Sequence, residues 1–131
     1  MITLFYAGLC TILVVFLSLR VVQWRFRHKI GLGDGGDKQL LMRVRAHANA
    51  VEYMPLAFIL LGGMELNGYN DRIIHVFGAT LLISRAAHAW GLSHSSGTSR
   101  GRFLGTFFTL LLLLAMAGFA IVGFLQGYAT E

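Results

Sequence analysis

Four long apolar stretches, separated by short polar segments, dominate the pattern of hydrophobic and polar positions along this chain. The first covers residues 1–19 without a charge, and the others centre on residues 54–64, 73–84 and 103–125. With their flanks, these stretches are long enough to cross the hydrocarbon core of a bilayer as helices. The single proline and the lack of strand-length alternation argue against a membrane β-barrel. The helices are expected at about residues 1–29, 38–67, 71–92 and 103–126.

The composition supports the same class of protein. Hydrophobic residues make up 56% of the 131 residues and charged residues only 13%, which lies well outside the range of soluble domains. We therefore predict an all-α integral membrane protein in which residues 1–131 form one domain. The one cysteine, Cys10, lies in an apolar run, has no partner for an intrachain disulfide, and is expected to serve in packing.

The charges predict the orientation in the membrane. The net charge is +5, and every Lys and Arg except Arg72 lies within residues 20–45 or 85–102, at the ends of apolar segments. This placement is typical of membrane topology and not of nucleic-acid binding. By the positive-inside rule both basic regions face the cytoplasm, with both termini on the outer, periplasmic side of a bacterial inner membrane. The first stretch lacks the basic start and the cleavage site of a signal peptide, so we expect a mature helix.

The first basic loop, GLGDGGDK at residues 31–38, matches G-x-G-x-x-G. No strand precedes it and its two aspartates would repel a phosphate, so nucleotide binding is disfavoured. Asp37 is instead expected to be the N-cap of the second helix. Pro55 falls inside that helix and should kink it unless a neighbour satisfies the freed carbonyl of Val51. A second polar loop, SHSSGTSRGR, is expected at residues 93–102.

Polar side chains in the second and third helices are the candidate functional residues. Arg45, Asn49 and Glu52 stand at i, i+4 and i+7, so they form one stripe of a helix. A carboxylate below the bilayer surface costs a few kcal/mol unless it is paired, and such residues are functional candidates. A buried network that only fixes helix register is the alternative. Arg85 and His88 stand at i and i+3 of the third helix, also on one face.

The histidines do not predict a metal site. His47, His75 and His88 are expected at different depths, and none has a second ligand at i+3 or i+4. His75 is expected near the outer end of the third helix, as an interfacial or core residue.

The segment from Arg45 to Pro55 reads R-A-H-x-N-x-x-E-Y-x-P. It resembles the second-helix motif of the MAPEG family, the membrane-associated proteins in eicosanoid and glutathione metabolism, and the short bacterial members above all. The resemblance implies a homotrimer of four-helix subunits that bind glutathione as a co-substrate at subunit interfaces near the cytoplasmic side. It assigns Arg45, Asn49, Glu52 and Tyr53 to that site.

The resemblance extends to the ends of the other helices. Arg25 matches an arginine at the inner end of the first helix, and Arg102 matches one that is often assigned to the thiol, in the pattern R-x-x-G with Gly105. Arg100 is the second candidate for that role. His88 and Leu92 stand where eicosanoid-metabolising members carry tyrosines, and His47 stands where some members have glutamine.

The chemistry of glutathione agrees with these residue types. Arg25, Arg45 and Arg85 suit its two carboxylates, and Glu52 suits its ammonium group or an arginine. Arg102 beside the sulfur would favour the thiolate. The leading hypothesis is a glutathione-dependent transferase or peroxidase that acts on lipophilic small-molecule electrophiles, which reach it from the membrane lipids. The alternatives are a non-catalytic lipid-binding or activating protein and a proton or ion pathway.

Overall fold

The computed structural model describes residues 1–94 and 99–128, and its regular structure is entirely helical over those residues. The four predicted helices are confirmed, as α1 (Ile2–His28), α2 (Lys38–Leu66), α3 (Asp71–His94) and α4 (Arg100–Tyr128). Helix α4 begins three residues before its predicted start. The hydroxyl of Ser99 accepts a hydrogen bond from the Arg102 amide at 3.3 Å. This bond caps the helix before the apolar run begins, so the helix starts earlier than the apolar run predicts. The predicted loop at residues 93–102 lies partly outside the described residues.

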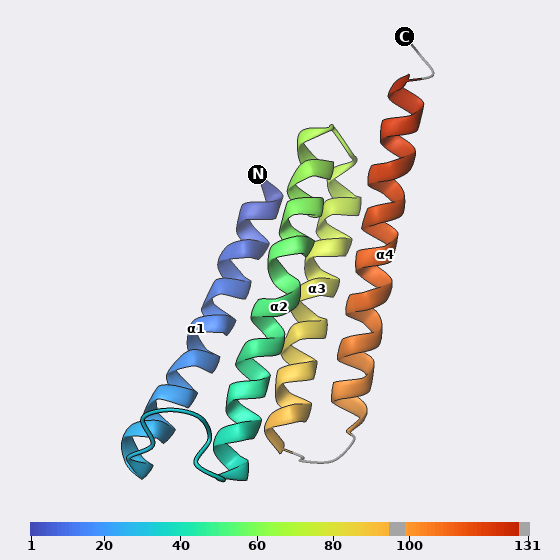
Figure 1. Ribbon diagram of the computed structural model, residues 1–131. Helices are drawn as coiled ribbons and strands as arrows, with labels where there is room; N and C mark the ends of the chain where they lie inside the picture. Colours follow the sequence, from blue (N-terminus) through green and yellow to red (C-terminus); the bar gives the residue numbers. More distant parts are fainter. Residues whose placement is uncertain (95–98, 129–131) are drawn as a thin grey trace.

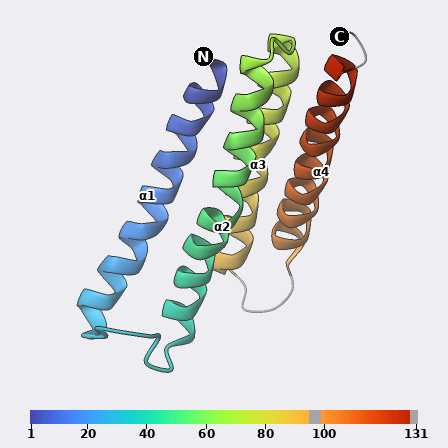
Figure 2. The ribbon, with the colours of Figure 1, turned by 45° about the horizontal axis from the view of Figure 1, so that its top comes forward.

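The four helices stand side by side and alternate in direction (Figure 1). Helices α2 and α3 form the middle of the subunit, and α1 and α4 flank them without packing against each other in the described residues. The same order holds in the tilted view of Figure 2. We call the end where α1 and α3 finish and α2 and α4 begin the basic end, because it carries the arginine-rich segments.

Three helices are long and apolar enough to cross a membrane by length and composition, namely residues 2–28, 71–92 and 100–127. Helix α2 is not among them, because the charged and polar residues along it lower its mean hydropathy. It nevertheless connects the basic end of α1 to the opposite end of α3 (Figure 1). If α1 and α3 both cross a bilayer in the same direction, α2 must cross it as well.

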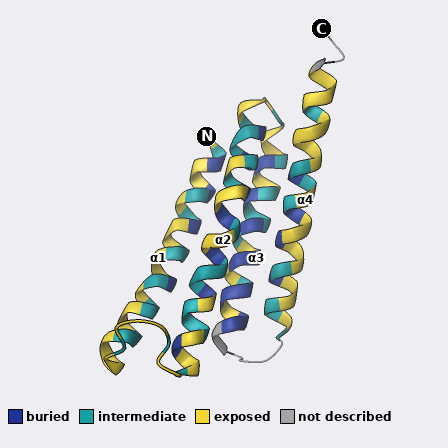
Figure 3. Ribbon diagram, viewed as in Figure 1, coloured by how far each residue is buried: buried dark blue, intermediate teal, exposed yellow. Residues whose placement is uncertain are grey.

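Burial follows the faces on which the helices meet (Figure 3). One cluster of buried residues joins α1 to α2 and α3, and it includes Cys10, as predicted for a packing residue. A second cluster joins α2, α3 and α4 nearer the opposite end. The first cluster consists of Cys10, Leu17, Ala46, Ala50, Met54, Ala89 and Leu92, and the second of Ala57, Leu61, Met64, Ile74, Leu81, Leu112 and Met116.

Asp37 is the N-cap of α2, as the sequence predicts. Its Oδ1 accepts hydrogen bonds from the amides of Gln39 at 2.7 Å and Leu40 at 3.1 Å. Its Oδ2 accepts a further bond from the indole nitrogen of Trp24 at 2.7 Å, which ties the end of α1 to the start of α2. The indole bond, followed by the amide bonds, lowers the pKa of the Asp37 carboxyl below its ordinary value. Further along, α2 passes through Pro55 without a break in the helix.

Glu65, near the end of α2, fixes the register of the first two helices. Its carboxylate accepts hydrogen bonds from the amides of Ile2 at 2.5 Å and Thr3 at 2.8 Å, so it caps the start of α1. Because the two helices are antiparallel, Arg20 is level with about residue 47 of α2. Glu52 then lies about 7 Å deeper in the apolar span than Arg20, at 1.5 Å per residue.

Candidate functional site

A single buried arginine connects three of the four helices. Arg85 of α3 is only 1% exposed. Its Nη1 donates to Oδ1 of Asn49 on α2 at 2.8 Å, and its Nη2 donates to the carbonyl of Gly105 on α4 at 2.8 Å. Its guanidinium also lies 5.3 Å from the centre of the Tyr53 ring. Two of the four predicted residues of the second-helix motif, Asn49 and Tyr53, therefore meet the predicted arginine of the third helix.

No carboxylate pairs with Arg85 among residues 1–94 and 99–128, and its Nε has no hydrogen-bond partner there. The cation is instead held by an amide oxygen, a backbone carbonyl and an aromatic face. Hydrogen bonds to a charged group typically contribute about 1.5–3 kcal/mol each. The network therefore makes a large contribution to helix packing, and the guanidinium has almost no surface to offer a ligand within one subunit.

The bond to Gly105 depends on a very close approach of α3 and α4. A Cβ atom at Gly105 would lie 2.6 Å from the carbonyl oxygen of Ser84 and 2.7 Å from the Cβ of His88. A Cβ at Gly91 would lie 2.6 Å from the backbone nitrogen of Arg102. Glycines thus bring the two backbones into contact at the basic end, and this contact sets the position of Arg102 relative to His88.

Beside this contact lies a groove with a volume of about 680 Å³. Both predicted candidates for the thiol, Arg102 and Arg100, line it, and so does His88, which is 7% exposed. The remaining lining combines two apolar side chains with two hydroxyls, from Phe103, Leu104, Ser99 and Thr106. The groove therefore offers positive charge next to an apolar wall.

The predicted polar stripe of α2 divides into two parts. Arg45 and Glu52 are exposed and make no hydrogen bond or ion pair with another described residue, whereas Asn49 and Tyr53 are half-buried against α3. At about 100° per residue, Asn49 lies about 40° to one side of Arg45, and Glu52 about 20° to the other. This offset turns the amide toward Arg85 and leaves the carboxylate on the outer surface.

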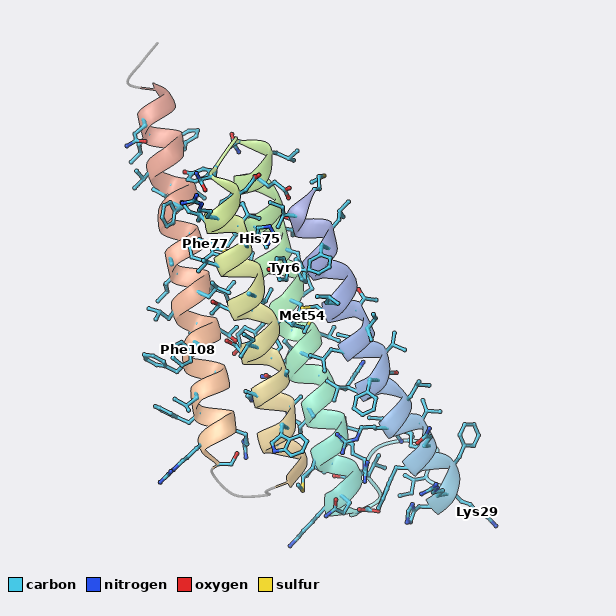
Figure 4. The ribbon with its side chains drawn as sticks, turned by 180° about the vertical axis from the view of Figure 1, so that it is seen from behind. Tyr6, Lys29, Met54, His75, Phe77 and Phe108 are labelled. Atoms are coloured by element: carbon cyan, nitrogen blue, oxygen red, sulfur yellow. The ribbon has the colours of Figure 1, made fainter. Side chains whose placement is uncertain are left out.

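The structure does not bring Arg25 into this network. Its Nη1 reaches the carbonyl of Ile30 at 3.4 Å, a long hydrogen bond that closes the end of its own helix. At the opposite end of the molecule, His75 lies near Tyr6, with its Nδ1 at 3.1 Å from the tyrosine hydroxyl (Figure 4). No group of three or more His, Cys, Asp or Glu side chains within the described ranges has the arrangement of a metal site.

Sequence reasoning selected Arg85 and Gly105 separately but missed that they bind each other. Two glycines could have indicated the contact. Gly91 lies in A-W-G-L near the end of the third helix, and Gly105 lies in R-x-x-G near the start of the fourth. Small residues at such positions let membrane helices approach closely.

Four alternating helices with an apolar exterior and a buried polar network define a helical integral membrane protein. Within that class the chain belongs to the MAPEG family, whose model matches residues 3–122. It is 35% identical over 117 residues to the inner membrane protein YecN of Escherichia coli strain K12, with 89% of each chain covered. YecN from an O6:H1 strain of Escherichia coli gives the same identity and coverage. The predicted family is thereby confirmed.

Proposed function

We propose that this protein is a glutathione-dependent membrane enzyme of transferase or peroxidase type, which acts on lipophilic electrophiles that reach it from the bilayer. The observation that carries the proposal is the groove at the basic end, where Arg100 and Arg102 lie beside His88 and an apolar wall. A thiolate needs a cation near the sulfur, and a lipophilic electrophile needs an apolar surface beside that cation.

The charged groups of the chain match those of glutathione. Arg45 and Glu52 are exposed on α2 and have no described partner. An exposed arginine and an exposed carboxylate complement a carboxylate and an ammonium group, and the groove arginines supply further positive charge. Glutathione would supply the thiol, while the chain's own residues bind its charged ends and favour its ionised sulfur.

We further propose that the protein is a homotrimer in which the exposed face of α2 contacts a neighbouring subunit. Leu56 and Ile59 follow Glu52 on this face and are 55% and 70% exposed. A carboxylate left in lipid costs up to roughly 3 kcal/mol, the value at the centre of a bilayer. Protein from a second copy of the chain would cover Glu52 and place its charge next to a cation, which completes the ligand site at the interface.

Glutathione titration tests the activity. The detergent-solubilised protein should melt at a higher temperature as glutathione increases to millimolar concentration, because a ligand that binds only the folded protein stabilises it. An analogue with a methyl group in place of the thiol should stabilise the protein similarly but support no turnover. If neither compound raises the melting temperature, the enzyme proposal fails, and a lipid-binding or activating role of the same fold takes its place.

Arg102→Leu tests the role of the groove arginine. The substitution should raise the pKa of the bound thiol and depress turnover at neutral pH, with partial recovery at higher pH. Ultraviolet titration of the thiolate measures this pKa directly. Arg100→Leu is the matched comparison, because Arg100 lines the same groove. An unchanged thiol pKa in both variants would remove the groove from the chemistry.

Glu52→Ala tests the trimer. If the neighbouring subunit buries Glu52 against a cation, its loss should destabilise the assembly by about 3–5 kcal/mol. Asp71→Ala is the control, because Asp71 is an exposed acid at the opposite end of the molecule. Analytical ultracentrifugation in detergent measures the assembly, and a Glu52→Ala protein that assembles like the parent would contradict the proposed interface.

A further inference from the structure

A second groove, with a volume of about 350 Å³, runs between α1 and α3. Its walls are apolar, and Arg20 is its one charged lining residue in the described part of the chain. The groove is formed by Leu13, Phe16, Leu17, Arg20, Ala86, Ala89 and Trp90. Arg20 is the first charged residue of α1 after the uncharged residues 1–19, so it marks the boundary between hydrocarbon and water at the basic end.

More positive charge surrounds Arg20. Arg43 of α2 lies within electrostatic range of both Arg20 and Arg27. The guanidinium of Arg43 is held 4.2 Å above the ring of Trp24, and its buried Nε has no hydrogen-bond partner. Arg43 is thus close to two further cations, one of which lines the groove, and an anion that binds among the three would reduce their mutual repulsion.

One acid close to this cluster, Asp37, is already engaged. Asp37 lies within range of Arg43, but its carboxylate accepts bonds from the Trp24 indole and from two amides at the start of α2. It neutralises at most one of the three arginine charges. The cluster therefore keeps a net positive charge directly at the end of an apolar groove.

We propose that the α1–α3 groove binds an anionic phospholipid, with its phosphate among Arg20, Arg43 and Arg27 and one acyl chain against the groove wall. A soluble anion would use the arginines without the groove, and a zwitterionic lipid would use the groove with little benefit from the cations. Basic pockets between transmembrane helices at this depth recognise anionic headgroups. The groove lies between α1 and α3, and the cations come from α1 and α2, so the site is separate from the groove beside α4 and does not depend on glutathione.

The positions of the tryptophans provide a direct assay. The chain has two tryptophans, and both lie at this site: Trp24 beneath Arg43, and Trp90 in the groove wall. In a Trp24→Phe protein, Trp90 is the only indole. The phenylalanine keeps a ring beneath Arg43, and Asp37 loses its indole bond but keeps its two amide bonds at the start of α2. This protein is reconstituted in phosphatidylcholine vesicles that contain one of two brominated lipids. The brominated lipid is either phosphatidylglycerol or phosphatidylcholine, and the quenching of Trp90 fluorescence is measured for each.

Brominated phosphatidylglycerol should quench Trp90 with an apparent affinity at least roughly fivefold higher than that of brominated phosphatidylcholine, as expected for one arginine contact. Arg20→Gln should reduce this preference, and Arg20→Lys should keep most of it. Lys38→Gln is the matched control, because Lys38 is an exposed cation at the same end of the molecule, outside the groove. Arg43→Gln carries the same test if Arg20→Gln does not fold.

Equal quenching by the two brominated lipids would overturn the proposal. A preference for phosphatidylglycerol that Lys38→Gln reduces as much as Arg20→Gln would also overturn it, because that result shows attraction to the surface and not a site. Soluble glycerol phosphate at millimolar concentration should leave the quenching unchanged. If glycerol phosphate instead relieves the quenching of Trp90, the ligand is a free phosphate and not a lipid, and the proposal is overturned.

Discussion

Replacement of Gly105 by alanine should separate α3 from α4. The new Cβ would lie 2.6 Å from the Ser84 carbonyl oxygen, 2.7 Å from the His88 Cβ and 2.8 Å from the His88 nitrogen. Two of these atoms are backbone and the third is fixed to it, so the helices themselves must move apart. Overpacking of this kind costs about 1–3 kcal/mol. The movement also lengthens the 2.8 Å bond from Arg85, whose loss costs a further 1.5–3 kcal/mol or so.

The expected loss of unfolding free energy is therefore about 2.5–6 kcal/mol, from overpacking and the lost bond together. It is measured by denaturation in mixed micelles with far-ultraviolet circular dichroism. Gly118→Ala is the control on the same helix, because a Cβ there meets no atom within 4 Å. Helix propensity alone should make that control slightly more stable than the parent, by up to about 1 kcal/mol. The two substitutions are thus expected to have opposite signs. If Gly105→Ala is as stable as Gly118→Ala, the close contact of α3 and α4 does not exist.

The other predictions concern the buried cation, the cap of α2 and the topology. Arg85→Lys should lower the free energy of unfolding by about 1.5–3 kcal/mol, because the single nitrogen of the shorter lysine side chain cannot occupy the positions of both Nη1 and Nη2. An unchanged denaturation curve would contradict the network. The pKa of Asp37 is lowered in the folded protein, so its stabilising effect is complete above the ordinary aspartate pKa and is lost as pH falls through the lowered value; Asp37→Asn should remove this part of the acid dependence of melting. A cysteine at Gly31, where a Cβ meets no atom and the backbone needs no glycine, should resist an impermeant maleimide in intact cells and react in inverted vesicles. Labelling in intact cells would reverse the proposed orientation.

The fold was largely predictable because its signals are local. Four apolar runs gave four helices, and Asp37 before a helical pattern gave an N-cap that the structure confirms. The helix ends were less predictable where a polar residue decides them. Helix α4 starts at Arg100 because Ser99 bonds the Arg102 amide, and hydrophobicity carries no information about that bond.

The contacts of the buried network around Arg85 could not be predicted from the sequence. Periodicity placed Arg45, Asn49 and Glu52 on one stripe of a helix. It could not show that Asn49 would accept a hydrogen bond from α3 while the other two side chains stay exposed. The deciding contact joins residues 36 positions apart, between Asn49 and Arg85, and therefore depends on how the helices pack. A single sequence predicts which residues share a face of a helix. Which other helix packs against that face depends on the tertiary structure.

The bond between Glu65 and the start of α1 has a consequence for assembly during synthesis. The amides of Ile2 and Thr3 donate their hydrogen bonds to Glu65, a residue that is synthesised 62–63 positions later. Until Glu65 has been synthesised and has reached α1, the first turn of that helix has no carboxylate to satisfy its amides. The α1–α2 hairpin is thus complete only when its last turn arrives, and a ribosome paused before Glu65 leaves α1 without its anchor.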